Sequence, residues 1–221
     1  MLFIFLMEIK SAMEDKIIEQ FISKKRLEQY DNDIEKYKEN LYISEKYYIL
    51  ISIFEISLRN SINFHFGKKY SNEWLFNLDK LPKLPNPKKP EHSIENKVET
   101  AKKVLSKRKE EATHNKVVAE LSFGFWTSLF HKSYSNIMRI PDIKDIFPNL
   151  PSKQEKKIDR QTMYQMINPI RILRNRIFHH EKIIDRKEYD ITKIESEIFD
   201  LLYYFDEEIY NFAKELTSNN K

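Results

Sequence analysis

The 221-residue sequence contains no cysteine and only two glycines, Gly67 and Gly124, and these absences exclude several classes of site. Without cysteine the chain can form neither a disulfide framework nor a cysteine-based zinc site, which fits a reducing cytoplasm. Two glycines cannot supply a Rossmann fingerprint, a P-loop or a kinase glycine-rich loop, because each needs several glycines at fixed spacing. They also leave β-hairpins without their usual turn residues. We therefore expect a mainly helical, cytoplasmic protein that binds phosphates, if at all, through side chains.

Long apolar runs are missing as well. Residues 2–7 are apolar, but the run is short and lacks the basic flank of a secretory signal. No stretch approaches the 18 or more apolar residues of a transmembrane helix, so we expect no membrane partner. A hydrophobic share of 41%, with 13% aromatic residues, is nevertheless too apolar for a disordered chain. The length suits one folded domain with a sizeable core.

Apolar residues at steps of three and four predict helices along most of the chain. In the first segment a break is expected near residues 31–33, and the Ser93 segment is followed by a short buried helix. The predicted helical segments are 13–39, 44–67, 93–120, 121–130, 152–178 and 187–216. We expect an all-α bundle that forms a single domain over residues 1–221, with a basic loop-plus-helix insertion at about 80–120.

Local signals set the expected ends of these helices. Ser44 is the predicted N-cap of the central helix, and Gly67 lies where its C-cap is expected. Ser152, followed three residues later by Glu155, forms a capping-box pattern, so we expect a helix to begin there, with a kink at Pro169.

The net charge of +4 hides two regions of opposite sign. Residues 80–109 hold ten basic and three acidic residues, and the last predicted helix holds nine carboxylates from Glu188 to Glu215 against two lysines. Runs of charge are usually solvated faces, but this basic segment is the best candidate for contacts to RNA phosphates. The candidate RNA-binding residues are Lys88, Lys89, Lys102, Lys103, Lys107, Arg108 and Lys109.

Residues 173–181 contain the side chains best suited to chemistry. Asn175 and His179 are four residues apart and share a helix face, while Arg174 and His179 flank a groove. Histidine can give and take protons near neutral pH, and arginine can stabilise a charged phosphate transition state. These groups suffice for RNA cleavage without a metal. The alternative interpretation is an exposed basic turn whose histidines favour the C-terminal end of the helix dipole.

The order Arg174-Asn175-Arg-Ile-Phe-His179-His-Glu resembles the Arg-x(4–6)-His signature of HEPN-fold ribonucleases. In its extended form it resembles the R-N-R-x-x-H-H-E motif of the Abi-like (abortive infection, AbiD/AbiF-type) bacterial proteins. Residues 55–60 and 121–130 agree with that family in the expected order. The resemblance implies a HEPN-like helical bundle and a homodimer. It also implies a metal-independent endoribonuclease in phage (antiviral) defence or a toxin–antitoxin system.

Carried over residue by residue, the resemblance assigns the catalytic histidine to His179 and the arginine to Arg174, with Asn175 as the polar neighbour. The spacing also admits His180, but His179 shares its helix face with Asn175. Three residues of the central helix either orient the groove or form an ordinary i,i+4 ion pair: Glu55, Arg59 and Asn60. The same helix offers a second Arg/His pair, Arg59 with His65, which we interpret as a coincidence.

Two further alternatives concern the ligands. The aromatic rings of Phe123, Phe125 and Trp126 could stack on bases, but the run is so apolar that core packing is favoured. No metal or other cofactor is expected, since His179, His180 and Glu181 are adjacent and point different ways.

The main rival to the ribonuclease is a non-cleaving protein that holds a structured small RNA, inhibitory or guiding. A third possibility is a protein-interaction role for the acidic last helix.

Overall fold

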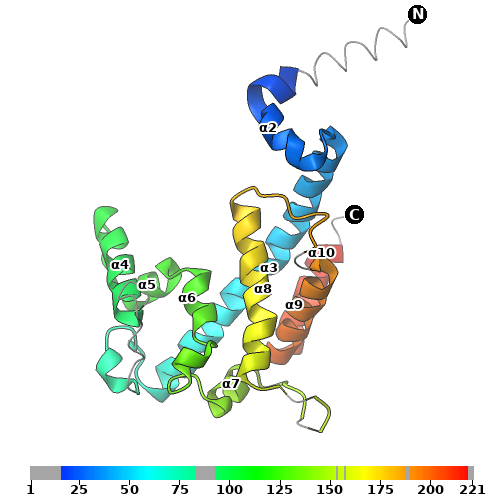
Figure 1. The fold of residues 1–221 in the computed structure, drawn as a ribbon. Helices are drawn as coiled ribbons and strands as arrows, with labels where there is room; N and C mark the ends of the chain where they lie inside the picture. The colour runs from blue at the N-terminus through cyan, green and yellow to red at the C-terminus, as the bar shows by residue number, and fades with distance from the viewer. Residues whose placement is uncertain (1–15, 83–92, 153, 157, 188–189, 219–221) are drawn as a thin grey trace, which may run out of the picture.

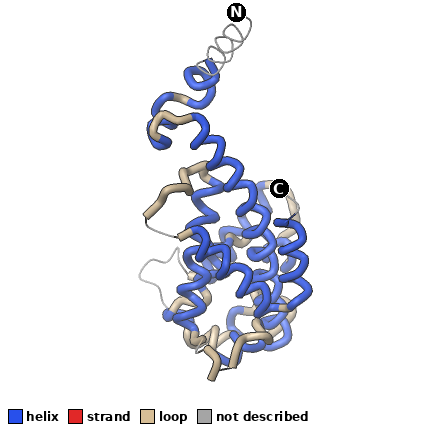
Figure 2. Tube along the Cα trace, turned by 90° about the vertical axis from the view of Figure 1, so that its right-hand side faces the viewer, coloured by secondary structure: helices blue, strands red, loops and turns tan. Residues whose placement is uncertain are grey.

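The computed structural model describes residues 16–82, 93–152, 154–156, 158–187 and 190–218, and every regular element in these ranges is a helix (Figure 2). The predicted all-α fold class is confirmed. The elements are η1 (Ile18–Ile22), α2 (Lys24–Leu27), η2 (Glu28–Tyr30), α3 (Ile34–Lys69), η3 (Leu78–Lys80), α4 (Ile94–Lys107), α5 (His114–Glu120), α6 (Phe123–Ser128), η5 (Lys132–Tyr134), α7 (Ile140–Ile146), α8 (Arg160–Phe178), α9 (Ile191–Phe205) and α10 (Glu207–Ser218).

Helix α3 is the axis of the molecule and contacts α6, α7, α8, α9 and α10. Figure 1 shows it crossing the molecule, with α9 and α10 towards one side and α4 to α6 towards the other. None of the described helices is both long and apolar enough to cross a lipid bilayer. Within the basic insertion expected at about 80–120, residues 83–92 lie outside the described residues.

Helix α3 is longer than the sequence signals suggested. Its 36 residues span about 54 Å, and it begins after Asp33, whose carboxylate accepts hydrogen bonds from two backbone N–H groups of the first turn (2.8 and 3.4 Å). The predicted N-cap Ser44 is wrong, because this residue lies inside the helix and its hydroxyl donates to the carbonyl four residues earlier. Gly67 is not the C-cap either, since the helix continues to Lys69.

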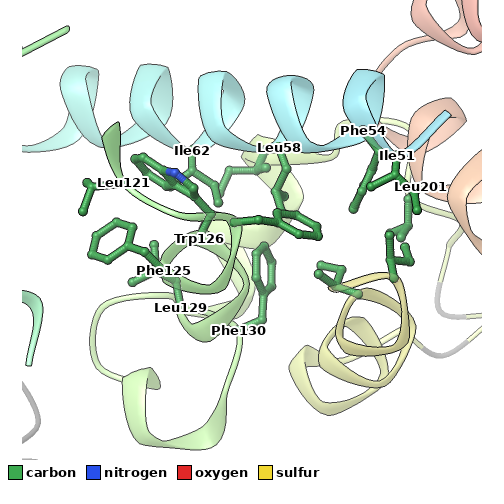
Figure 3. Close-up of a cluster of buried hydrophobic side chains, with 14 of the residues drawn as sticks. Ile51, Phe54, Leu58, Ile62, Leu121, Phe125, Trp126, Leu129, Phe130 and Leu201 are labelled. Atoms are coloured by element: carbon green, nitrogen blue, oxygen red, sulfur yellow. The ribbon is translucent and has the colours of Figure 1, made fainter. Parts of the chain in front are cut away.

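The core forms where α3 meets the aromatic run. The buried α3 side chains Ile51, Phe54, Leu58 and Ile62 follow one another at steps of three and four. Figure 3 shows Leu58 and Ile62 over the aromatic run, and Ile51 beside Leu201 of α9. Helix α6 carries the run as the predicted short buried helix, and Phe123 and Trp126 are 1% and 0% exposed. Core packing of the run is thereby confirmed, since such buried rings have no face left for a base.

Two predicted long helices are each divided in the structure. The 93–120 helix is wrong as one element, because α4 ends at Lys107 and α5 begins at His114. The 187–216 helix breaks at Asp206, whose backbone is extended and whose carboxylate accepts the N–H of Glu208 (2.7 Å). At Asp206, a capping side chain therefore divides a helix whose apolar periodicity continues across the break.

Only the Glu155 half of the predicted Ser152 capping box forms, and it does not start a helix. Glu155 Oε2 accepts hydrogen bonds from the backbone N–H and the hydroxyl of Ser152, both at 2.9 Å. Only a turn follows, and α8 begins at Arg160, where the Asp159 carboxylate accepts the N–H of Thr162 (2.9 Å). The predicted start of this helix was therefore about eight residues too early. Pro169 lies inside α8, as the sequence predicts.

Three helices end at non-glycine residues with left-handed backbone: Asp31 (φ 59°), Lys109 (φ 59°) and His180 (φ 55°). In each case the N–H of the following residue bonds the carbonyl five residues before it, at 3.1, 3.0 and 2.8 Å respectively. This is the Schellman motif, in which the left-handed position usually belongs to glycine. With so few glycines in the chain, other residues take these positions.

The segment after α8 is fixed to α3 by a buried amide. Asn40 is 2% exposed, and its Oδ1 accepts the backbone N–H groups of Ile183 (2.7 Å) and Ile184. Two turns further along α3, the Tyr47 hydroxyl donates to Glu195 of α9 (2.9 Å). These bonds hold the C-terminal end of α8 and the start of α9 beside the first half of α3.

Candidate functional site

Arg174, on the last turns of α8, is held by side chains from two helices. Its Nε donates to Glu55 Oε2 of α3 at 3.1 Å, and its guanidinium carbon lies 3.8 Å from the centre of the Phe178 ring. The Phe178 ring packs on Tyr48 of α3 with centroids 5.4 Å apart. Of the three guanidinium nitrogens, only Nε has a hydrogen-bond partner among the described residues. Both Nη groups can therefore donate to a ligand.

Phe178 and Tyr48 are the parts of this site that sequence reasoning missed. Phe178 follows Arg174 by four residues and therefore shares its helix face. Tyr48 precedes Glu55 by seven residues, which is two helical turns along α3. The sequence thus contained a spacing signal for both rings, and their contact with the Arg174 pair required knowledge of how α3 and α8 pack.

The helix end places the two candidate histidines in different backbone environments. His179 caps α8 with a backbone close to helical (φ −94°, ψ 9°), and its N–H donates to the Asn175 carbonyl at 3.0 Å. His180 occupies the left-handed position of the Schellman motif, and Arg26 donates to its carbonyl oxygen. Both histidines are exposed. Only His179 continues the helix face that carries Asn175.

The three central-helix candidates separate in the structure. Glu55 pairs with Arg174 across the helix interface, and no Glu55–Arg59 ion pair forms among the described residues. Arg59 instead donates through Nε to Asn60 Oδ1 at 3.3 Å. Glu55 is therefore the member of this group that the fold brings to Arg174, whereas Arg59 and Asn60 bond each other.

A second cluster of charged groups lies near the C-terminal end of α3, around Asp142 in the first turn of α7. The Asp142 carboxylate is almost fully buried and accepts hydrogen bonds from His65 Nε2 (2.9 Å), Lys69 and the backbone N–H of Arg139 (2.8 Å). Burial alone would raise the pKa of Asp142, but these hydrogen bonds hold its pKa below the ordinary value. Arg59 and His65, the second Arg/His pair of the sequence, therefore have separate partners: His65 bonds Asp142, and Arg59 bonds Asn60.

The Asp142 cluster fixes α7 to α3. The bond to the Arg139 N–H is the reciprocal half of a capping box, so one carboxylate both starts α7 and ties it to two α3 side chains. A cavity of about 610 Å³ opens beside it. Because the donors facing the carboxylate already bond it, the geometry is that of a structural anchor.

Part of the positive charge of the basic segment is neutralised by ion pairs in the structure. Lys102 pairs with Glu99 (2.7 Å), and Arg108 binds Glu120 through both Nη groups (2.8 and 3.3 Å). Three of the predicted RNA-binding residues are exposed and form no ion pair with a described residue: Lys103, Lys107 and Lys109. The other two lie outside the described residues: Lys88 and Lys89. Glu120 follows the counted basic segment, so a sequence window could not reveal its pairing.

Neither a metal-binding cluster in the described residues nor a match to a known protein identifies this site. Among the described residues, no group of three or more His, Asp or Glu side chains could hold a metal ion. The resemblance to the Abi-like and HEPN proteins rests on the short motifs at residues 55–60, 121–130 and 174–181 alone. No protein-family model, no curated protein and no solved structure matches this chain.

Proposed function

We propose that the protein is a metal-independent HEPN-type endoribonuclease of the Abi-like class, with Arg174, Asn175 and His179 as its reactive groups. The observation that carries the proposal is the support of Arg174 at the end of α8. Glu55 and the Phe178 ring fix its orientation, and its Nη groups have no partner among the described residues, while Asn175 and the exposed His179 follow within the same end of α8. A fixed cation with unused donors and an exposed imidazole are groups that phosphate chemistry can use.

The proposed reaction is an internal attack within the RNA. A histidine acting as base takes the proton from a 2′-hydroxyl, and the 2′-oxygen forms a bond to the adjacent phosphorus. The bond from phosphorus to the 5′-oxygen breaks, and that oxygen receives a proton from a second acid. Arg174 stabilises the extra negative charge on the phosphorane oxygens, and Asn175 orients the substrate or the imidazole. The products are a 2′,3′-cyclic phosphate and a 5′-hydroxyl.

The need for both a base and an acid supports a homodimer. One His179 per chain supplies one such group, and a second copy of α8 across a two-fold axis would supply the other. Phe178 and Tyr48 are 41% and 49% exposed and lie against the Arg174 pair, so they offer apolar surface beside the site. Phage defence or toxin–antitoxin function follows from the motif resemblance and is proposed on that basis.

The test is cleavage of end-labelled RNA by the purified protein in excess EDTA. We expect His179→Ala to lower the rate by about 10²–10⁴-fold and Arg174→Ala by about 10²–10³-fold. Product ends are identified by the resistance of the cyclic phosphate to phosphatase and by its opening in acid. Cleavage that is unaffected by both substitutions would sink the proposal.

Two matched variants make this test specific. Arg176 lies on the same helix and pairs with Glu181 at 2.9 Å, with 24% side-chain exposure against 27% for Arg174. Arg176→Ala should therefore leave cleavage nearly unchanged if position rather than charge matters. His180→Gly removes the alternative histidine while suiting its left-handed backbone. Loss of activity in this variant, with His179→Ala active, would move the catalytic role to His180.

A non-cleaving RNA-binding protein is the second candidate, and it is favoured by Lys103 and Lys107 of α4, which are exposed and form no ion pair with a described residue. In that case RNA should co-purify with the protein, with an affinity that falls steeply with salt. Charge reversal at Lys103 and Lys107 should then abolish binding, whereas His179→Ala should leave the bound RNA intact. Sequencing the co-purified RNA would identify a small inhibitory or guide RNA directly.

A further inference from the structure

A cavity of about 410 Å³ lies between the first turns of α8 and the segment that follows α6. Its lining combines two aromatic rings, two amides and two cations over a floor formed by Phe130. These six polar or aromatic side chains are His131, Lys132, Arg160, Gln161, Tyr164 and Gln165. None of the motifs discussed above includes them.

The two rings of the cavity are held in place. The His131 and Tyr164 rings meet edge to face with centroids 5.3 Å apart, and His131 Nδ1 lies 2.9 Å from the Ser133 hydroxyl. Both rings are only partly buried, so they retain exposed surface at the cavity. Bases of single-stranded nucleic acids stack on such aromatic side chains without needing a particular sequence.

The polar groups match the rest of a nucleotide. Gln161 and Gln165 are exposed and one helical turn apart, and each amide can both donate to and accept from a base edge. Arg160 donates to the Met138 carbonyl (3.3 Å), and neither Arg160 nor Lys132 forms an ion pair with a described residue. Two positive charges are thus available for phosphate oxygens.

A polar stripe connects this cavity with the proposed cleavage site. Five side chains follow one another along one face of α8 at steps of four, three, four and four: Tyr164, Asn168, Arg171, Asn175 and His179. Fifteen residues at 1.5 Å each separate its ends by about 22 Å. Arg171 bonds Asn168 Oδ1 through two nitrogens and, among the described residues, has no carboxylate partner. In Figure 1, α8 (yellow) runs from α7 to the loop that leads to α9.

We propose that single-stranded RNA lies along this face of α8 and that the cavity holds one unpaired base, a few nucleotides from the scissile phosphate. Tyr164 and His131 stack on the base, Gln161 and Gln165 contact its edge, and Arg160, Arg171 and Lys132 contact phosphates. This inference rests on the proposed function, because it takes RNA as the substrate. It adds a subsite that selects for unpaired bases.

The test uses the full-length chain with His179→Ala, so that RNA binding is measured without cleavage. The probe is a fluorescein-labelled, mixed-sequence, single-stranded RNA of twelve nucleotides, followed by anisotropy at low salt. We expect Tyr164→Ala to weaken binding by about 5- to 100-fold and Tyr164→Phe to keep it, because the ring is retained. The same RNA annealed to its complement should bind more weakly than the single strand.

Tyr203→Ala is the matched control. Tyr203 is also a partly exposed tyrosine in an edge-to-face ring contact, with Tyr210 at 5.7 Å, but it lies on α9 and outside the cavity. Its substitution should leave RNA binding unchanged. Thermal unfolding of each variant shows whether a loss of binding follows from a loss of fold, and the phenylalanine variant tests the ring in a chain that keeps its packing.

The outcomes separate the subsite from the ribonuclease. If wild-type protein cleaves no RNA but Tyr164→Ala loses RNA binding, the proposed function fails and the base subsite stands. If the wild type cleaves and a folded Tyr164→Ala binds and cleaves the same RNAs at the same positions, the subsite is wrong and the ribonuclease stands. Mononucleotides that bind as tightly as the twelve-nucleotide RNA would also overturn it, because the phosphate contacts along α8 would then contribute nothing.

Discussion

Two carboxylates tie α3 to neighbouring helices by bonding cations, yet their clusters are built in opposite ways. Asp142 of α7, near the C-terminal end of α3, is 2% exposed and receives hydrogen bonds from three residues. Glu55, in the middle of α3, is partly exposed and binds a single nitrogen of Arg174, which lies on the last turns of α8 before the exposed histidines. A buried cluster whose donors all bond its own carboxylate holds helices together. A partly open cluster with unused donors can bind a ligand.

The largest expected effect is the loss of the buried carboxylate. Asp142→Ala would leave Lys69 and the Arg139 N–H without their partner inside the protein, and should reduce the free energy of unfolding by about 3–5 kcal/mol. Glu55→Ala breaks a partly exposed pair and should cost no more than about 1 kcal/mol. Urea unfolding of both variants measures the difference. Equal costs would show that the two clusters do not differ as described.

The next effect concerns activity rather than stability. Glu55→Gln should release the Arg174 guanidinium from its fixed position and lower RNA cleavage by about 10- to 100-fold, since small misplacements of a catalytic group are costly. Glu181→Gln is the control, because it weakens the neighbouring Arg176 pair of the same helix. Single-turnover cleavage rates of the two variants decide the point, and a similar decrease in both would argue against a specific positioning role for Glu55.

The contribution of Asp142 to stability should depend on pH. Because hydrogen bonds lower the pKa of Asp142 in the folded protein, its contribution is complete above the unfolded pKa, about 4, and is lost as the pH falls through the folded pKa. The stability difference between the wild type and Asp142→Asn should therefore be constant near neutral pH and shrink below about pH 4. Urea midpoints from pH 7 to 2.5 provide the measurement. A difference that persists unchanged in acid would contradict it.

Apolar periodicity predicted the all-α class, the central helix and the buried aromatic run, because burial of these rings dominates their placement. It could not predict helix ends. Ser44 is a good cap by type, but apolar residues on both sides of it pack on the core, so α3 continues through it. The pairing of Glu55 with Arg174 spans 119 residues and depends on how α3 and α8 pack. The motif resemblance pointed to both Arg174 and Glu55 as candidates, whereas their ion pair and the packing of Phe178 on Tyr48 required the structure.

The smallest expected effect concerns the C-terminal end of α8, whose backbone the sequence did not predict. His180 adopts a left-handed backbone at φ 55°, which costs a residue with a Cβ more than it costs glycine. Although glycine also gains freedom in the unfolded chain, His180→Gly should leave stability unchanged or raise it by up to about 1 kcal/mol. His179→Gly lies in a near-helical position and should instead reduce stability by about 0.5–1 kcal/mol. Opposite signs in thermal unfolding would confirm that the backbone distinguishes the two histidines. A His180→Gly variant that is clearly less stable would contradict this prediction.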